Sequence, residues 1–110
     1  MEGVAAVHVR EIRHPQADQI DLATVLRTVG DPVRLEIVRL LSDGGERNCG
    51  QMTEALGLPT STGSYHLRLL REAGITRTRA EGTERHISLR RDDLDERFPG
   101  LLDAVIRSRG

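Results

Sequence analysis

The fold of this chain is decided by the stretch Pro59-Thr60-Ser61-Thr62-Gly63-Ser64-Tyr65-His66-Leu67-Arg68-Leu69-Leu70-Arg71-Glu72-Ala73-Gly74. Positions 63, 67, 70 and 74 recur at helical spacing and are all small or apolar, so they predict a face that packs against a core. Positions 61, 64, 65 and 68 point away from that face and carry hydroxyl or guanidinium groups. Such groups hydrogen-bond to phosphates and base edges. The stretch therefore predicts a helix with one buried side and one polar side suited to nucleic acid.

The segments on either side of this helix define a larger unit. Asn48 and Gln51 predict a capping box at the start of a short preceding helix, and Gly57-Leu58-Pro59 predicts a compact turn. After the helix, two strands are expected over 76–80 and 84–90, around the turn Glu81-Gly82-Thr83. Helix, turn, helix and hairpin in this order are typical of a winged helix-turn-helix, which lays its second helix in a DNA groove.

Helices are also expected at both ends of the domain. Apolar positions predict one over 20–29, and Asp31-Pro32 supplies the cap and first residue of another, which ends at Gly44-Gly45. Apolar positions over 94–106 predict a terminal helix that Pro99 kinks or divides. The predicted fold is mainly α with a small β-hairpin (α+β), in the order ααααββα. Residues 1–18 are expected to form a flexible N-terminal arm, and residues 19–110 a winged helix-turn-helix domain for DNA binding and dimerisation.

The charge is distributed unevenly along the sequence. The formal net charge is −1, yet residues 60–91 carry seven arginines against three acidic residues. This basic segment coincides with the polar helix and hairpin, where it would neutralise phosphates. The sequence has no glycine-rich phosphate loop, no Cys/His dyad at a useful spacing and no distinctive pair of acids, so we do not expect an enzyme.

Length and composition bound the class of protein. A chain of 110 residues with one Phe, one Tyr and no Trp must build an aliphatic core, and we expect a partner subunit to bury part of its apolar surface. A single cysteine excludes an internal disulfide and fits a reducing cytoplasm. No apolar run is long enough for a membrane span. We therefore expect a soluble cytoplasmic protein without a membrane partner.

Residues 30–37, 56–58, 66–75 and 81–89 resemble the ArsR/SmtB family of small bacterial transcription regulators. The resemblance covers residues 20–91. It implies a homodimer joined through its first and last helices, presenting two recognition helices to an inverted-repeat operator. It also implies a repressor that leaves DNA when a metal or another inducer binds. The dimer contacts expected on this basis are Leu22, Val25, Leu26, Leu101, Leu102 and Val105.

Gly63 departs from the family pattern, which usually has a branched apolar residue at this place. Glycine inside a helix costs about 1 kcal/mol relative to alanine. It would permit close approach to a neighbouring helix or to DNA, but we interpret it as a tolerated substitution.

The candidate DNA contacts fall on the polar helix and on the hairpin. In the helix, base-edge or water-mediated contacts are expected from Ser61, Thr62, Ser64 and Tyr65. Phosphate contacts are expected from Thr60 and Arg68, although Arg68 at i, i+4 from Glu72 would also form an ordinary surface ion pair. His66 is expected to be structural, bonding near the turn. In the wing the candidates are Arg79, Thr83 and Arg85, opposed by the acids Glu81 and Glu84.

A metal site is the less supported part of the resemblance. One family site uses a Cys-x-Cys pair, but here Cys49 has no second cysteine beside it, and the terminal helix has acids without a histidine. The other candidate ligands are His8 and His14, which would join Cys49 across a dimer around nickel or zinc; two solvent-exposed histidines are the alternative. Two further functions stay open: a winged-helix protein-interaction module, and a DNA-binding subunit that acts with a separate metal-sensing partner protein.

Overall fold

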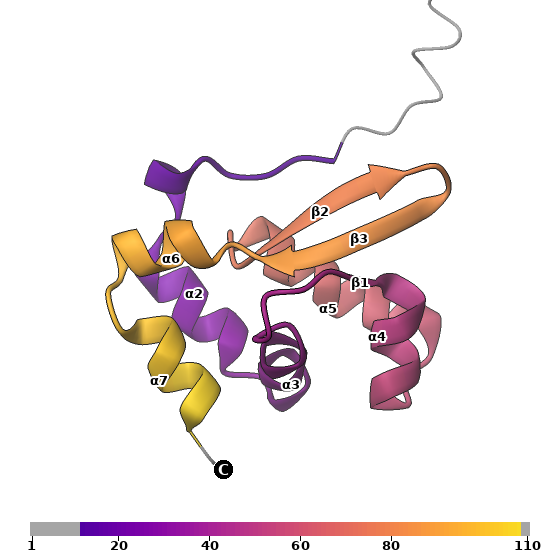
Figure 1. The fold of residues 1–110 in the computed structure, drawn as a ribbon. Helices are drawn as coiled ribbons and strands as arrows, with labels where there is room; N and C mark the ends of the chain where they lie inside the picture. Colours follow the sequence, from indigo (N-terminus) through magenta and orange to yellow (C-terminus); the bar gives the residue numbers. More distant parts are fainter. Residues whose placement is uncertain (1–11, 109–110) are drawn as a thin grey trace, which may run out of the picture.

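In the computed structural model, which describes residues 12–108, helices pack against an antiparallel sheet whose hairpin extends beyond them at its turn (Figure 1). The elements that precede the hairpin are η1 (Ala17–Gln19), α2 (Leu22–Val29), α3 (Pro32–Leu40), β1 (Arg47–Asn48), α4 (Cys49–Leu56) and α5 (Thr60–Glu72). The hairpin and the elements that follow it are β2 (Thr76–Glu81), β3 (Glu84–Leu89), α6 (Arg91–Arg97) and α7 (Leu101–Arg107).

The predicted helix starts are confirmed by their caps. Asp31 Oδ1 accepts hydrogen bonds from the amides of Val33 (2.8 Å) and Arg34 (3.1 Å), at the start of α3. Burial raises the pKa of the Asp31 carboxyl, but these two amide hydrogen bonds outweigh it, so the pKa lies below its usual value. At the start of α4, Asn48 Oδ1 accepts from the Gln51 amide (2.8 Å), and Gln51 Oε1 accepts from the Asn48 amide (2.9 Å). Both α3 and α4 are thus fixed by local side chains.

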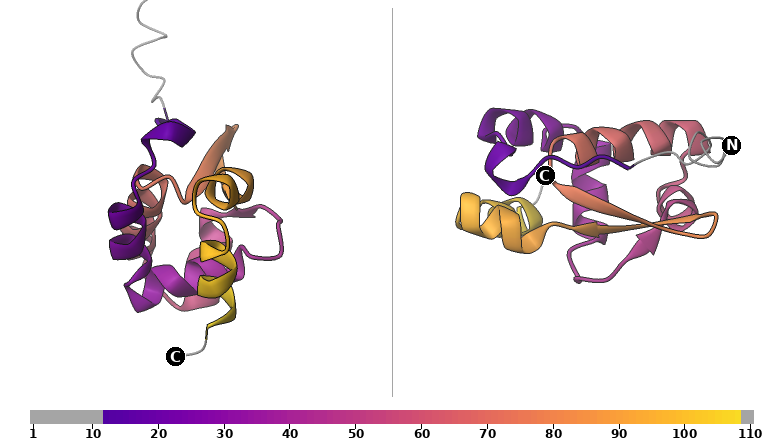
Figure 2. Two further views of the ribbon diagram at one scale, coloured as in Figure 1. Left: turned by 90° about the vertical axis from the view of Figure 1, so that its left-hand side faces the viewer. Right: turned by 90° about the horizontal axis from the view of Figure 1, so that it is seen from above.

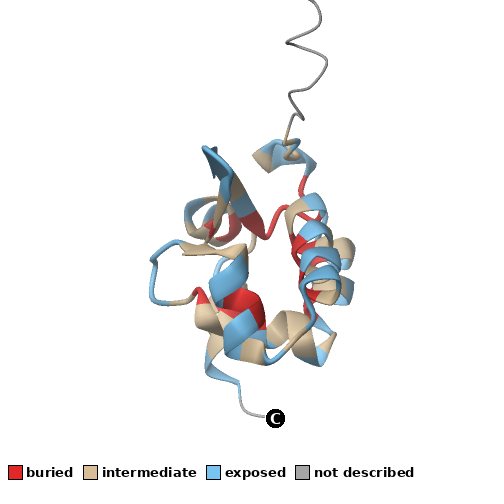
Figure 3. Ribbon diagram, turned by 90° about the vertical axis from the view of Figure 1, so that its right-hand side faces the viewer, coloured by how far each residue is buried: buried red, intermediate tan, exposed pale blue. Residues whose placement is uncertain are grey.

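The core of the domain is one aliphatic cluster. Figure 3 colours the buried residues of the ribbon red. Gly63, Leu67 and Leu70 of α5 are buried, and Gly74 is buried just after the helix, which confirms the predicted inner stripe. Helices α2, α3 and α4 and strand β2 all contact α5. The polar helix is therefore anchored from several sides, and its orientation is set by the whole domain. The buried apolar residues around it include Ile20, Val25, Ile37, Val38, Leu41, Met52, Ile75 and Ile87.

The sheet has three strands in the order β1-β3-β2, where the sequence predicted two. The predicted hairpin is present, and its register runs from Thr76 opposite Leu89 to Glu81 opposite Glu84. The additional strand β1 pairs Arg47 with Ile87 and Asn48 with His86 of β3. The sequence did not predict β1, because a strand of two residues is too short to show an alternation of apolar and polar side chains. Its pairing partners also lie far along the chain.

The terminal helix is divided at Pro99, as predicted. Helix α6 ends at Arg97, and α7 begins at Leu101 after Gly100, whose φ of 84° is left-handed. Figure 2 shows α6 and α7 beside α2 at one end of the molecule. At the other end of the sequence, the helix expected over 20–29 begins only at Leu22, after the short turn η1.

The interpretation of Gly63 as a tolerated substitution is wrong. A Cβ atom at Gly63 would overlap with Cγ2 of Thr53, so the contact between α4 and α5 leaves no room for a side chain at position 63 beside this threonine. Thr53 is itself buried at 7 % exposure. Glycine is required here by helix-to-helix contact.

Within residues 12–108, no helix combines the length and the apolar character needed to cross a membrane.

Candidate nucleic-acid interface

The outer face of α5 carries the polar side chains that the sequence places there. Ser61, Ser64, Tyr65 and Arg68 are exposed, and Tyr65 retains 50 % of its accessible surface. Thr60, the first residue of α5, is exposed as well, whereas Thr62 is half-buried. The predicted division of this helix into an inner apolar side and an outer polar side is confirmed. Its outer side offers hydroxyl and guanidinium groups over more than two turns.

Tyr65 is held between two neighbours on the same helix. The guanidinium carbon of Arg68 lies 5.6 Å from the centre of the Tyr65 ring, and the His66 ring meets it edge-on at 5.3 Å between centroids. Arg68 also forms the ion pair with Glu72 that the sequence suggested, at 3.4 Å. Both partners of that pair are half-exposed, so it contributes at most a few tenths of a kcal/mol and leaves Arg68 able to turn toward a phosphate.

His66 was expected to form a hydrogen bond near the turn, but its partner lies elsewhere. Its Nδ1 atom lies 3.1 Å from Nη1 of Arg34, which comes from α3. His66 thus has the expected structural role, but with a different partner. The sequence carried no signal for this pair, because the two residues lie on separate helices.

The two wing arginines differ in their surroundings. Arg79 donates to both carboxylate oxygens of Glu46, at 3.1 and 2.8 Å, and to Glu81 at 3.1 Å. The hydrogen bonds that Arg79 donates to Glu46, and then the one to Glu81, raise the pKa of Arg79; the contact with Arg79 lowers the pKa of Glu46. Arg85, by contrast, donates to the Glu84 carbonyl at 3.4 Å. Glu46 was not anticipated, because it faces the hairpin only once β1 is paired.

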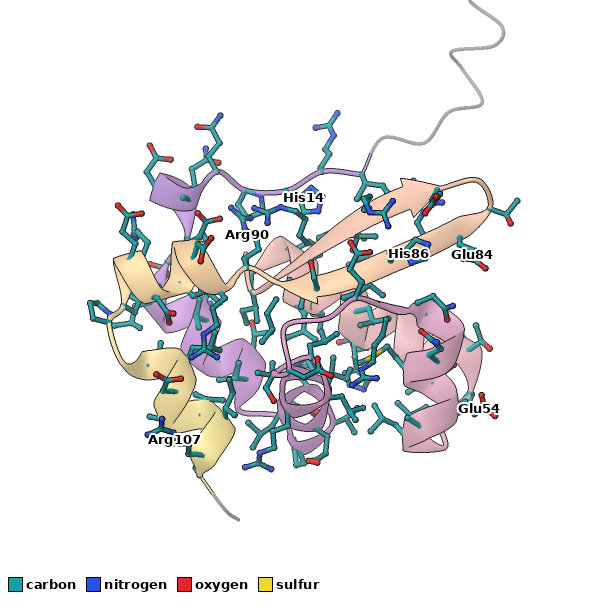
Figure 4. The ribbon with its side chains drawn as sticks, viewed as in Figure 1. His14, Glu54, Glu84, His86, Arg90 and Arg107 are labelled. Atoms are coloured by element: carbon teal, nitrogen blue, oxygen red, sulfur yellow. The ribbon has the colours of Figure 1, made fainter. Side chains whose placement is uncertain are left out.

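The tip of the wing combines a hydroxyl with acidic groups. Thr83 is exposed in the turn, and His86 Nε2 lies 3.3 Å from Glu84 and 3.5 Å from Glu81 (Figure 4). The tip is therefore less basic than the run of arginines in the sequence suggests.

The expected dimer contacts fall into two groups. Leu22 and Leu26 of α2 expose 44 % and 47 % of their surface. Val25 and Leu102 are instead buried in the protomer's own core, at 3 % and 4 %. Leu101 and Val105 of α7 are half-buried. An apolar crevice between α2 and the α6–α7 segment is lined by Val25, Val29, Ile75, Leu94, Leu101, Leu102 and Val105.

The candidate metal ligands are not assembled into a site within residues 12–108. His14 Nε2 accepts a hydrogen bond from the Thr78 amide (3.0 Å), which occupies that ring nitrogen. Burial, and then the charges of Arg90, Arg71 and Arg77, lower the pKa of His14; Figure 4 shows it beside Arg90.

Cys49 lies elsewhere, half-buried at the start of α4, with Sγ 3.9 Å from Ser64 Oγ. His8 falls outside the described residues. In the described part of the chain, no three His, Cys, Asp or Glu side chains come together as a tetrahedral metal cage requires.

Comparisons with known proteins agree with this geometry. Residues 29–79 match the family described as helix-turn-helix domain. The HTH-type transcriptional regulator YceK of Bacillus subtilis is 36 % identical over 91 residues, which are 82 % of this chain and 91 % of that protein. The cadmium resistance regulatory protein CadC homologue of Staphylococcus aureus is 31 % identical, over 78 % of this chain and 75 % of its own. The chain belongs to the ArsR/SmtB family.

A solved structure described as that of a possible ArsR-family transcriptional regulator has the same fold. The homodimeric winged helix-turn-helix DNA-binding domain Mb0332 of Mycobacterium bovis is 30 % identical, matches 70 % of each chain and has a TM-score of 0.63. The predicted winged helix-turn-helix fold is thereby confirmed. As an ArsR/SmtB member, the protein is a helix-turn-helix transcriptional regulator, in which α4 and α5 form the helix-turn-helix and β2–β3 the wing.

Proposed function

We propose that this ArsR/SmtB regulator binds a specific inverted-repeat operator in double-stranded DNA as a homodimer and represses transcription from it. The observation that carries the proposal is the outer face of α5, where exposed polar side chains stand on a helix anchored from beneath. An anchored helix of this kind keeps the backbone positions of its polar residues fixed before DNA arrives, so the helix itself need not be ordered on binding.

The outer face divides by chemistry into groups that read bases and groups that hold phosphates. Ser61, Thr62, Ser64 and Tyr65 present hydroxyl groups, which donate to and accept from base edges, directly or through water. Thr60 lies at the start of α5, where free backbone amides favour an anion, and Arg68 extends from the exposed side.

In the wing, Arg85 and Thr83 are assigned to the DNA backbone, and Arg79 makes a smaller contribution. Glu46 and Glu81 already neutralise the Arg79 guanidinium, so a phosphate must compete with two carboxylates for it. Arg85 faces no such competition from the groups it contacts.

The dimer is assigned to α2 together with α7. Leu22 and Leu26 are exposed on α2, and Val25 and Val29 of the same helix line the apolar crevice, so a second copy docked on α2 and α7 would cover exposed apolar surface. The homodimeric state of the Mycobacterium bovis domain supports a homodimer here. A two-fold dimer presents two identical α5 helices and therefore requires an inverted repeat.

Repression is supported by named relatives. BigR of Xylella fastidiosa, a transcriptional repressor, is 31 % identical over 70 % of this chain, with a TM-score of 0.59. The arsenical resistance operon repressor of Staphylococcus xylosus is 33 % identical over 68 % of this chain. We assign no metal-dependent step to residues 12–108, because their candidate ligands are dispersed.

The test is selection of bound duplexes from random oligonucleotides, followed by anisotropy titrations of the selected and a scrambled duplex at several salt concentrations. We expect an inverted repeat, and an affinity for both duplexes that falls as salt rises. Arg68→Ala should weaken binding, whereas Arg107→Ala, an equal charge change on α7 away from α5 (Figure 4), should not.

Two results would contradict the proposal. Absence of binding to any duplex at low salt would favour the protein-interaction alternative. Equal losses with Arg68→Ala and Arg107→Ala would show that binding follows net charge and does not use the α5 face.

A further inference from the structure

Arg34 connects three helices through separate atoms. Its backbone amide is capped by Asp31 at the start of α3, and its Nε donates to the Thr28 carbonyl of α2 at 2.7 Å. Its Nη1 reaches His66 of α5 at 3.1 Å. One half-buried side chain thus links the last turn of α2 to the middle of the recognition helix.

The contact between Arg34 and His66 fixes the state of the imidazole. A guanidinium group has donors only, so Nδ1 of His66 must be the acceptor. The proton of the neutral ring then resides on Nε2. Arg34 therefore selects one tautomer of His66 and also fixes the plane in which the ring lies.

The fixed ring of His66 in turn meets Tyr65. The two rings are inclined by 65°, in the edge-on arrangement that aromatic pairs prefer. Tyr65 is half-exposed and has few other constraints, apart from the Arg68 guanidinium on its ring. The orientation of the Tyr65 hydroxyl on the DNA-facing side consequently depends on His66.

We propose that Arg34 and His66 are positioning residues that orient Tyr65 for base recognition, neither of them needing to touch DNA itself. The proposal rests on the proposed function, since it concerns the same face of α5. It goes beyond that function by assigning specificity to two residues behind the contact surface.

A double-mutant cycle tests the proposal. Binding to the selected duplex is measured for the wild type, His66→Ala, Tyr65→Ala and the double variant. His66→Ala should weaken binding about three- to tenfold in the wild-type background, and by less than about twofold once Tyr65 is absent. The His66→Ala variant should also discriminate less against single base changes. Equal losses in both backgrounds would overturn the proposal, because they indicate a purely structural role.

Arg34→Lys provides the second arm of the test. It retains the charge and the backbone amide that Asp31 caps, but a single ammonium cannot replace the two-sided contact to Thr28 and His66. We expect a loss similar to that of His66→Ala, again dependent on Tyr65. Arg39→Lys on the same helix is the matched control and should bind like the wild type. His66→Asn, which keeps an acceptor near the Nδ1 position but has no ring for Tyr65, replaces His66→Ala if that variant unfolds.

The tautomer is measured without DNA, by ¹⁵N chemical shifts of the His66 ring. We expect protonated Nε2 and unprotonated Nδ1 in the wild type, and loss of this preference in Arg34→Lys. Protonated Nδ1 in the wild type would overturn the proposal even if DNA binding is normal. Failure to bind any duplex, with the expected tautomer present, would instead refute the proposed function.

Discussion

Gly63 of α5 packs directly on Thr53 of α4, with no space between them for a methyl group. The Thr53 hydroxyl also donates back to the carbonyls of Cys49 and Gly50, which fixes the rotamer that directs Cγ2 at Gly63. The distance between the two helices of the helix-turn-helix is therefore set by this pair.

Gly63→Ala should destabilise the domain by about 1–3 kcal/mol, because overpacking outweighs the gain in helix propensity. Urea unfolding followed by circular dichroism measures the change. Adding Thr53→Ser, which removes Cγ2 and keeps the hydroxyl, should restore most of the stability. A Gly63→Ala variant as stable as the wild type would show that α4 and α5 can separate without loss.

Asp31→Ala should lower the free energy of unfolding by about 1 kcal/mol at neutral pH, while Asp31→Asn should cost less because asparagine is also a good cap. The pKa of Asp31 is lowered in the folded state. The carboxylate therefore stabilises the fold above its unfolded pKa of about 4, and this contribution is lost as the pH falls through the lower folded pKa. Unfolding curves of wild type and Asp31→Asn should accordingly converge in acid; a constant difference would contradict the cap.

The wing arginines should differ in their effect on DNA affinity. Arg85→Ala should weaken binding to selected and scrambled duplexes alike and reduce the slope of log affinity against log salt by about 1. Arg79→Ala should have a smaller effect, because Glu46 and Glu81 already neutralise it. Glu46→Gln should increase affinity by weakening that competition. The reverse order of the two arginines would refute this account of the wing.

The contact of His14 with the wing should depend on pH. Only the neutral ring can accept from the Thr78 amide through Nε2, and burial together with Arg90, Arg71 and Arg77 lowers the pKa of His14. The contact should thus begin to weaken as the pH falls below about 6.5, the ordinary pKa of a histidine side chain, and should be lost as the pH passes through the lowered pKa of His14. Hydrogen exchange at Thr78, corrected for intrinsic rates, measures this. His14→Gln retains an acceptor that does not titrate, so its Thr78 protection should stay constant, and a parallel decline in both proteins would exclude His14 as the cause.

Substitutions should distinguish the exposed from the buried residues among the expected dimer contacts. Leu26→Glu places a charge on the exposed side of α2 and should shift sedimentation toward the monomer while the far-ultraviolet circular dichroism is retained. Val25→Ala should instead lower the unfolding free energy by about 1–3 kcal/mol, since it opens a cavity in the protomer core. A Leu26→Glu protein that sediments like the wild type would place the dimer elsewhere.

The features predictable from the sequence were those with local causes. Asp31-Pro32, the Asn48–Gln51 box and the break at Pro99 act through neighbours within a few residues, so their effect does not require knowledge of the fold. The two faces of α5 were likewise visible as periodicity. These signals also gave the order of elements, and the ArsR/SmtB resemblance agreed with it.

The features missed depend on residues brought together from distant parts of the chain. Glu46 reaches Arg79 only through the pairing of β1 with β3, and Arg34 reaches His66 only through the packing of α3 on α5. The requirement for Gly63 was misjudged for the same reason, because Thr53 becomes its neighbour only when two helices meet. Local signals thus predicted which helix and hairpin carry the candidate DNA-binding residues. They did not predict the residues from other elements, such as Arg34 and Glu46, that orient or neutralise those side chains.

The short strand β1 has a consequence for how a duplex is received. Asn48 pairs with β3 through its backbone while its side chain begins α4, so the hairpin and the helix-turn-helix cannot pivot independently. A duplex contacted by both must adapt its groove widths and curvature to a rigid template. Under the proposed function, we expect sequences that bend or twist easily to be preferred even at base pairs that no side chain reaches.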